Sequence, residues 1–215
     1  MKILTIGSLK NLEEVKLKFG ETHGYSLAGD RASAKGEFEN IELIFDFAVD
    51  ATAQLEIYRT PHPPAFINGS TVSLKNLMQG LQPLAFGFCG MPTFLNRKIL
   101  EVSVSGVGDM AKLKEVCDQL KTNFEVVADR VGLVTPRVIC MIINEAYYTL
   151  EEGTATREDI ELAMKLGTNY PYGPFEWATL IGLKNVCGLL EAVGKDTNDR
   201  RYRICPLLLK ESLSN

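Results

Sequence analysis

The sequence lacks the features of several protein classes. Its longest apolar runs, such as residues 138–143, are far shorter than the roughly eighteen residues that a membrane-spanning helix needs. The 23 Lys and Arg nearly balance the 27 Asp and Glu, for a net charge of −4, which argues against binding nucleic acid through phosphate charge. The apolar start, Met1 to Gly7, has no small-residue cleavage site and predicts a strand, not a signal peptide. We therefore expect a cytoplasmic protein that binds neither nucleic acid nor membrane.

Metal-binding and disulfide patterns are also missing. The cysteines are odd in number and form no C-x-x-C pair: Cys89, Cys117, Cys140, Cys187 and Cys205. This spacing predicts small buried side chains, not a disulfide framework or a zinc site. The two histidines, His23 and His62, have no plausible metal partner beside them in the sequence. We expect no bound metal.

The composition is that of an ordinary globular protein, with 46% hydrophobic and 23% charged residues among 215. The first half alternates short β-rich runs with turns and helical patterns. The predicted helices are Asn11–Phe19 and Asp109–Leu120, and the predicted strands are Lys2–Ile6, Tyr25–Ala28, Ile41–Phe47, Ala65–Asn68, Ala85–Phe88, Ile99–Ser105 and Phe124–Ala128. This order predicts a mostly parallel sheet covered by helices.

The second half carries long helical periodicity instead. Its caps and stops predict four helices: one capped by Thr135 with Pro136 in its first turn that runs to Gly153, one opened by Thr156 and Asp159 and stopped by Gly167, one that begins at Pro174, and one between Gly182 and Gly194. The change of pattern predicts two domains, a sheet domain over residues 1–130 and a helical domain over residues 131–215.

The helical half also carries a specific set of motifs. They are Asn144-Glu145-Ala146, Leu150-Glu151-Glu152-Gly153, Glu158-Asp159-Ile160, Ala163-Met164-Lys165-Leu166-Gly167, Tyr170-Pro171-Tyr172-Gly173-Pro174-Phe175-Glu176 and Ile181-Gly182-Leu183, extended by Arg201-Tyr202-Arg203 and Pro206-Leu207-Leu208. In this order and spacing the block from Gly132 to Val186 resembles the C-terminal domain of the 3-hydroxyacyl-CoA dehydrogenase family. The resemblance implies a helical domain that supplies much of the subunit interface and one wall of an acyl-CoA site.

The resemblance continues upstream in three segments. Leu43–Phe47 with Val49-Asp50 is similar to the family's strand and acidic loop, Ser70–Leu74 to its Asn-Thr-Ser-Ser-Leu loop, and Phe86–Val102 to the segment with its catalytic His and Glu. The stretch before Ile41 is much shorter than in the family. The resemblance therefore implies an α/β plus all-α chain: a reduced Rossmann-type, mostly parallel sheet followed by a helical, 6-phosphogluconate-dehydrogenase-like C-terminal domain.

The family uses NAD, which such a fold holds with a G-x-G-x-x-G turn after the first strand. Only Gly7 matches this motif, and Leu9 places a branched side chain where the dinucleotide needs bare backbone. Asp30 follows Gly7 by 30 − 7 = 23 positions, near the roughly 20 expected for the acid that holds the adenine ribose. An Asp after a strand is also a common loop residue. NAD is thus implied by resemblance alone, and we expect that it is not bound.

The family's catalytic positions match this chain unevenly. Glu101 matches the Glu that orients the catalytic His, but the His position falls on Cys89. The Ser of the Asn-Thr-Ser-Ser loop falls on Val72, with Ser73 beside it, and the Asn that opens the long helix falls on Pro136. A thiol titrates near pH 8.5, about two pH units above an imidazole, so it is a poor substitute for a histidine base. Glu101 is either a residual active-site acid or a strand carboxylate that pairs with a neighbour.

Three functions compete on this reading. The first is a non-catalytic relative whose helical half keeps a homodimer and an acyl-CoA groove. The second is an active NAD-dependent 3-hydroxyacyl-CoA (3-hydroxybutyryl-CoA) dehydrogenase of fatty-acid metabolism. The third is a new reaction that uses Cys89 and Glu101. Loss of the glycine turn together with the His, Ser and Asn favours the first, because positioning of cofactor and proton acceptor supplies most of the rate enhancement.

The surface of the helical half carries the remaining predictions. Apolar residues outside one helical stripe predict a homodimer: Met141, Ile142, Tyr147 and Tyr148. Tyr170, Tyr172 and Trp177 either line a ligand groove or anchor packing, and packing is the more common role. The charged run from Lys195 to Arg203 either reaches coenzyme A phosphates or is a solvated loop, and we favour the loop.

Overall fold

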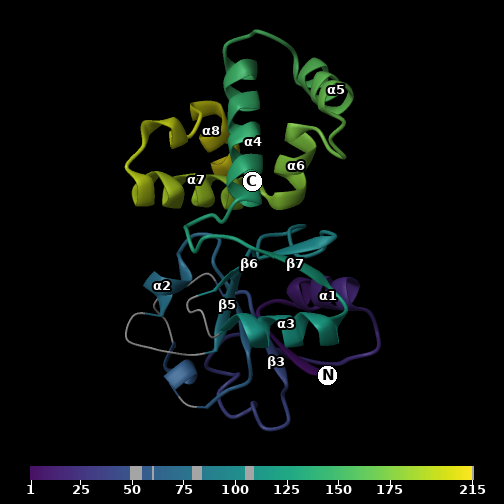
Figure 1. The fold of residues 1–215 in the computed structure, drawn as a ribbon. Helices are drawn as coiled ribbons and strands as arrows, with labels where there is room; N and C mark the ends of the chain where they lie inside the picture. The colour runs from purple at the N-terminus through teal and green to yellow at the C-terminus, as the bar shows by residue number, and fades with distance from the viewer. Residues whose placement is uncertain (49–54, 60, 79–83, 105–108, 215) are drawn as a thin grey trace. The chain divides into compact units, whose positions relative to one another are not determined.

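The computed structural model describes residues 1–48, 55–59, 61–78, 84–104 and 109–214. Val49, Asp50 and Ser105, which the sequence places in a loop and at a strand end, lie outside these ranges. The chain divides into two compact units, Met1–Leu133 and Val134–Asn215. Figure 1 shows strands and helices in the first unit and helices in the second.

The first unit is built on a seven-stranded sheet with the order β2-β1-β3-β4-β5-β6-β7. Its strands are β1 (Lys2–Ile6), β2 (Gly24–Ala28), β3 (Leu43–Asp46), β4 (Ala65–Asn68), β5 (Ala85–Phe88), β6 (Ile99–Val104) and β7 (Asn123–Val126). Neighbouring strands are parallel except for β5 and β6, which are antiparallel. The predicted mostly parallel sheet is therefore confirmed.

The two faces of the sheet are covered differently. Helices α1 (Leu9–Phe19) and α3 (Asp109–Leu120) pack on one face, where Phe19 and Val116 join a core that contains Phe45, Phe66 and Phe88. The opposite face is covered by the turns of residues 31–40, by the 3₁₀ helix η1 (Leu55–Arg59) and by α2 (Leu74–Leu77). Because both faces are buried, the central strands are continuous apolar runs.

Most of the predicted elements are present, with shifted ends. The strands at residues 2–6, 65–68 and 85–88 and the helix at residues 109–120 have the predicted bounds. The strand predicted from Ile41 to Phe47 is shorter, and the last strand begins and ends before its predicted bounds. Continuous apolar runs contain no alternation that marks where pairing stops, so hydrogen bonds to the neighbouring strands decide the ends.

The second unit contains only helices. They are α4 (Thr135–Glu151), α5 (Arg157–Thr168), α6 (Pro174–Ile181), α7 (Leu183–Thr197), the 3₁₀ helix η2 (Arg200–Tyr202) and α8 (Pro206–Ser214). All four predicted helices are present, and η2 and α8 were not predicted. Thr156 caps α5 as expected, because its side chain accepts a hydrogen bond from the Asp159 N–H.

Three predicted helix ends in this unit are wrong. Thr135 is the first residue of α4 and not its cap. Gly167 and Gly194 lie inside α5 and α7, which are capped at their ends by Asn169 and Asn198, both in the left-handed conformation. Asparagine adopts that conformation more readily than most residues, so it ends a helix as glycine does. A Cβ at Gly194 would lie 3.6 Å from the Tyr202 Cβ, an ordinary van der Waals distance, so this neighbour does not require a glycine.

The residues that the structure describes contain no membrane-spanning helix and no cluster of metal ligands. None of their helices is both long and apolar enough to cross a bilayer. No group of three or more His, Cys, Asp or Glu side chains among them could hold a metal ion. None of the five cysteines forms a disulfide, and all five are buried, as predicted.

Candidate functional site

The carboxyl ends of the parallel strands form the natural place for a ligand in the first unit. The chain passes from β1 to β2 on one side and then to β3 on the other, so the strand order reverses beside β1. Ligands of open α/β sheets bind at such a reversal, outside the carboxyl ends of the strands. Gly7, Phe47, Ser70 and Cys89 follow β1, β3, β4 and β5 at this edge.

The turn after β1 is closed by side chains of α1 itself. Ser8 caps the helix, and the Asn11 Oδ1 accepts hydrogen bonds from the Ser8 N–H at 2.9 Å and from the Ser8 Oγ at 2.7 Å. Gly7 has φ +149°, and a Cβ there would lie 2.7 Å from the Asn11 Oδ1. This glycine is therefore explained by its backbone conformation and by the close approach of Asn11.

The residues present do not fit a dinucleotide pyrophosphate. Such a group is held by N–H groups at the helix N-terminus that have no other partner, and glycines allow it to come close to the backbone. Here the Ser8 N–H already donates to Asn11, and Leu9 in the first turn carries a side chain that is 61% exposed. Leu12 is buried where the third glycine of the motif would stand. The chain thus supplies its own acceptor where phosphate oxygens would be needed.

Asp30 caps the turns that follow β2. Its carboxylate accepts from the Ser33 N–H at 2.7 Å, while its own N–H donates to the Ser33 Oγ at 3.2 Å. These hydrogen bonds from Ser33 lower the pKa of the Asp30 carboxyl, so it is charged at neutral pH. Asp30 thus lies where the ribose-binding acid was expected, and the structure gives its carboxylate a role in the turn.

The residue after Asp30 belongs to a buried polar cluster that the sequence did not indicate. The Arg31 Nε lies 2.6 Å from the Asp46 Oδ2, and their side chains are 2% and 0% exposed. The Tyr58 hydroxyl donates to the same Asp46 oxygen at 2.7 Å, and the Ala48 N–H donates to the other at 2.9 Å. Burial and the charge of Asp46 raise the pKa of Tyr58 well above its ordinary value. The cluster ties the short β2–β3 connection and η1 to the sheet.

Cys89, at the position of the family's histidine, is a buried thiol. It is 6% exposed, and burial raises its pKa to about 12, with further upward contributions from the charges of Glu101 and Glu14. The Ser70 Oγ lies 3.5 Å from the Cys89 Sγ. At neutral pH this thiol is protonated, so it acts neither as a base nor as a nucleophile. The proposed reaction of Cys89 and Glu101 loses its support.

The serine beside Cys89 is Ser70 and not the predicted Ser73. The Ser73 side chain accepts from the Asn76 N–H and caps α2. The Asn68 Oδ1 accepts from the N–H groups of Ser70 at 3.1 Å and of Gly90 at 3.0 Å. The order Asn68-Gly69-Ser70-Thr71 could have been aligned with the family's Asn-Thr-Ser-Ser loop, and this register places its serine on Ser70.

Glu101 is half-buried on β6, where it pairs in register with Glu125 on β7. The negative charge of Glu101 is among the causes that raise the pKa of the Cys89 thiol. The structure therefore brings Ser70, Cys89 and Glu101 together at one edge of the sheet. With a protonated thiol in place of the family's imidazole, this cluster lacks the histidine base for a substrate hydroxyl.

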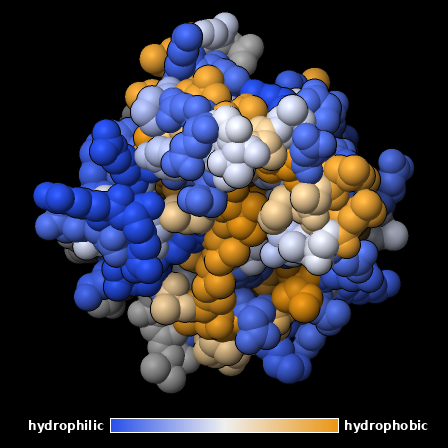
Figure 2. All heavy atoms as spheres, turned by 90° about the horizontal axis from the view of Figure 1, so that it is seen from above, coloured by the Kyte–Doolittle hydropathy of each residue, from blue (hydrophilic) through white to orange (hydrophobic). Residues whose placement is uncertain are grey.

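The helical unit has an apolar groove between α4 and α5. Its volume is about 440 Å³, and Ile142, Ala146, Ile160 and Met164 lie along it. Apolar atoms form a band bordered by hydrophilic residues on the face seen in Figure 2. Met141, Ile142 and Tyr148 are half-buried, as surface apolar residues would be.

Tyr147 and the predicted aromatic group are explained by packing. Tyr147 is 1% exposed, packs its ring 5.0 Å from that of Phe175 and donates to Glu211 at 2.8 Å, so it adds nothing to the surface. The ring of Trp177 lies 5.3 Å from Tyr170 and 6.4 Å from Tyr172. Both tyrosine rings thus contact the Trp177 ring at an angle, which favours the packing interpretation.

Comparison with known proteins gives the same family that the motifs suggest. Residues 132–213 match the family model for the 3-hydroxyacyl-CoA dehydrogenase C-terminal domain. The chain is 38% identical over 120 residues to 3-hydroxyadipyl-CoA dehydrogenase of Escherichia coli K12, which covers 54% of this chain and 25% of that protein. It is 44% identical over 90 residues to a probable 3-hydroxybutyryl-CoA dehydrogenase of Bacillus subtilis, covering 42% of this chain and 31% of that protein. The chain thus spans about a quarter to a third of these relatives.

A solved structure extends the likeness in fold. The crystal structure of M. tuberculosis FadB2 superposes with a TM-score of 0.79 over 99% of this chain and 93% of that chain, at 17% identity. At this identity the match shows the fold alone. The predicted order of a reduced Rossmann-type sheet and a helical domain is thereby confirmed.

Proposed function

We propose that the chain, whose residues 132–213 match the C-terminal domain of the 3-hydroxyacyl-CoA dehydrogenase family, is a divergent member of that family that does not transfer hydride with NAD. In this proposal the helical unit forms a homodimer and retains acyl-CoA binding. The five cysteines form no disulfide, which fits a reducing compartment and supports the cytoplasm as its location.

One observation carries the proposal: the turn after β1 is occupied by its own helix. The Asn11 side chain accepts the hydrogen bond of the Ser8 N–H, and Leu9 and Leu12 occupy the positions where the motif requires glycines. The family's histidine base is missing as well, because its position holds Cys89, and burial raises the pKa of this thiol to about 12. An enzyme of this family needs both the cofactor and the base in position, so losing both removes most of the rate enhancement.

The alternative is an active NAD-dependent 3-hydroxyacyl-CoA dehydrogenase, such as a 3-hydroxybutyryl-CoA dehydrogenase of fatty-acid metabolism. It is favoured by the retained strand order and by the cluster of Ser70 and Glu101 at the expected edge of the sheet. Activity then requires a proton acceptor other than Cys89.

Titration with NADH, followed by its fluorescence, separates the two functions. We expect no change up to millimolar cofactor, whereas the Bacillus subtilis relative serves as the positive control. A variant that restores the glycines, L9G/L12G with N11A, tests the cause: weak NADH binding should appear because the turn is opened. Micromolar binding to the unmodified chain, or turnover of a 3-hydroxyacyl-CoA, refutes the proposal.

Calorimetry with acetoacetyl-CoA tests whether the acyl-CoA site is kept. We expect binding by the chain without NADH, because the proposed site depends on the helical unit. Lack of any heat at millimolar ligand refutes the acyl-CoA part and leaves an interaction module.

The homodimer is proposed to form through the exposed apolar residues of α4 and α5. Val138, Leu162 and Leu166 are 51%, 58% and 77% exposed and lie on the helices that border the apolar groove. Sedimentation velocity at micromolar concentration should show a dimer that L162D/L166D converts to monomer. The matched control L17D changes a leucine of α1 that is also 77% exposed and should leave the dimer intact. A monomeric unmodified chain contradicts this part.

A further inference from the structure

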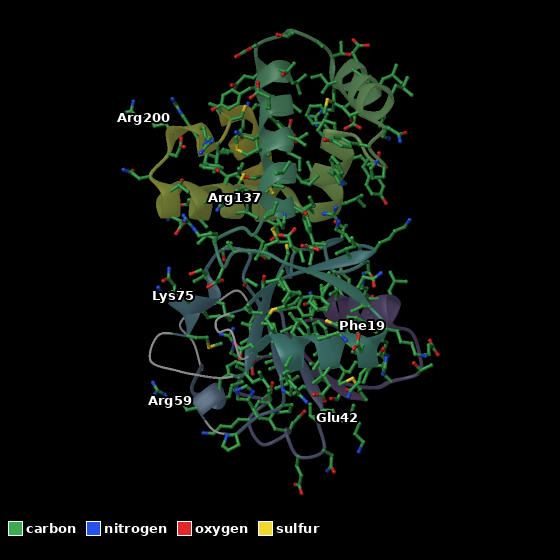
Figure 3. The ribbon with its side chains drawn as sticks, in the orientation of Figure 1. Phe19, Glu42, Arg59, Lys75, Arg137 and Arg200 are labelled. Carbon is green, nitrogen blue, oxygen red and sulfur yellow. The ribbon has the colours of Figure 1, made fainter. Side chains whose placement is uncertain are left out.

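A second pocket in the helical unit combines positive charge with an apolar wall. Its volume is about 640 Å³, and it lies where α7 ends and η2 begins. Its lining consists of the charged residues Glu191, Asp199, Arg200 and Arg203 and of Leu190, Gly194, Tyr202 and Ile204. Arg200 lies on the segment that joins α7 to α8 (Figure 3). The pocket is separate from the groove between α4 and α5, with which it shares no lining residue.

The two arginines project from the same side of one 3₁₀ turn. The Arg203 N–H donates to the Arg200 carbonyl at 3.0 Å, which closes the turn that Asp199 caps through the Arg201 N–H. Side chains three positions apart are aligned in a 3₁₀ helix. Arg200 and Arg203 therefore face one pocket, while Arg201 lies elsewhere, against Asp199 and over the ring of Tyr202.

The charges around the pocket leave these two cations unneutralised. Glu191 is paired with Lys195 at 2.8 Å, and Asp199 is paired with Arg201 at 2.8 Å. Across the described part of the chain, neither Arg200 nor Arg203 makes an ion pair. The lining itself holds two carboxylates and two guanidinium groups. Because both carboxylates pair with cations outside the lining, Arg200 and Arg203 are left without a counterion.

The turn is also held firmly by the buried core of the unit. Asn144 of α4 is 2% exposed, and its Nδ2 donates to the Arg203 carbonyl at 2.9 Å. The Oδ1 of the same side chain accepts from the Cys205 N–H at 2.9 Å. A preorganised backbone lowers the cost of ordering the arginines around a ligand.

We propose that this pocket binds a phosphate monoester that carries an apolar body. The dianion matches the two free positive charges, and its three terminal oxygens accept hydrogen bonds from two guanidinium groups at once, which a single carboxylate does less well. The wall at Gly194 and Ile204 leaves room for the apolar part of the ligand. This site goes beyond the proposed function, which concerns NAD and the acyl-CoA groove.

Calorimetry on the full chain with phenyl phosphate tests the proposal. We expect phenyl phosphate to bind, inorganic phosphate to bind at least several-fold more weakly, and phenol not to bind. The R200Q/R203Q variant should lose at least tenfold in affinity. The control K184Q/K210Q removes two exposed lysines of the same unit outside the pocket and should keep affinity within about twofold.

Urea unfolding of both variants checks that they fold. The proposal is overturned if phenyl phosphate does not bind at millimolar concentration, or if both double variants lose affinity equally. Coenzyme A and dephospho-coenzyme A differ by one phosphate monoester. If coenzyme A binds more tightly than dephospho-coenzyme A and R200Q/R203Q abolishes this difference, coenzyme A is the natural ligand of the pocket. If phenyl phosphate binds but the two coenzymes bind equally, the pocket binds another phosphate monoester. NADH binding or turnover would refute the proposed function and leave this result unchanged.

Discussion

Alkaline unfolding tests whether Cys89 is held as a buried, protonated thiol. Burial raises its pKa from 9.0 to about 12. Between these values the unfolded chain has lost the thiol proton while the folded chain keeps it, so stability must fall as the pH rises. The gap of 12 − 9 = 3 corresponds to about 4 kcal/mol at about 1.4 kcal/mol per pH unit, an upper bound that is present below pH 9 and lost as the pH rises to 12.

The C89S variant isolates this effect, because a serine keeps the contact with Ser70 but does not titrate in this range. Urea unfolding of both proteins at pH 8 to 11 in the presence of a reductant, followed by circular dichroism, gives their free energies of unfolding. Lysines and tyrosines titrate alike in both proteins and cancel in the difference. We expect the advantage of the unmodified chain to fall by about 2.3 kcal/mol between pH 9 and pH 11, because the unfolded thiol is already half ionised at pH 9.

A difference that stays flat over this range would refute the reasoning. It would mean that the thiol ionises as readily in the folded chain as in the unfolded one. Cys89 would then again be a candidate for a reactive group beside Ser70 and Glu101.

Three further changes probe the packing that shapes both units, each measured by urea unfolding. D46A leaves a guanidinium and a tyrosine hydroxyl buried without their carboxylate, so it should lower the free energy of unfolding by about 3–5 kcal/mol. The control D118A breaks an exposed ion pair and should lower it by less than about 0.5 kcal/mol. E161A removes the carboxylate that accepts from two N–H groups at the start of α6 and should cost about 1–2 kcal/mol, read by the fluorescence of the single tryptophan. G87A places a Cβ 2.2 Å from the Ser103 Oγ and should cost about 1–3 kcal/mol, part of which S103A recovers.

Each of these expectations has a contradicting result. Equal losses for D46A and D118A would mean that the buried cluster is not isolated from water. An unchanged tryptophan transition in E161A would show that α6 needs no cap. Failure of S103A to recover any stability in the G87A background would place the strain elsewhere than at the Ser103 hydroxyl.

Local signals predicted most of the elements. The β-rich runs of the first unit and the capping motif at Thr156 act within a few residues, so they can be read without the fold. Helix ends were harder, because Gly167 and Gly194 continue their helices, while Asn169 and Asn198 end them in the left-handed conformation. Cys89 was placed in the site from its spacing to Glu101, and the structure gives both residues a shared electrostatic environment.

The amino-acid order by itself determined the succession of strands and helices, the family likeness of residues 132–213, and the loss of two glycines and a histidine. Tertiary structure decided the rest. It selected Ser70 over Ser73, closed the turn after β1 with Asn11, and buried Arg31 against Asp46. The physical reason is that a side chain's chemistry depends on its solvent exposure and on the charges and hydrogen bonds around it, and folding supplies these from residues far apart in the chain or from rotamers that the sequence leaves open.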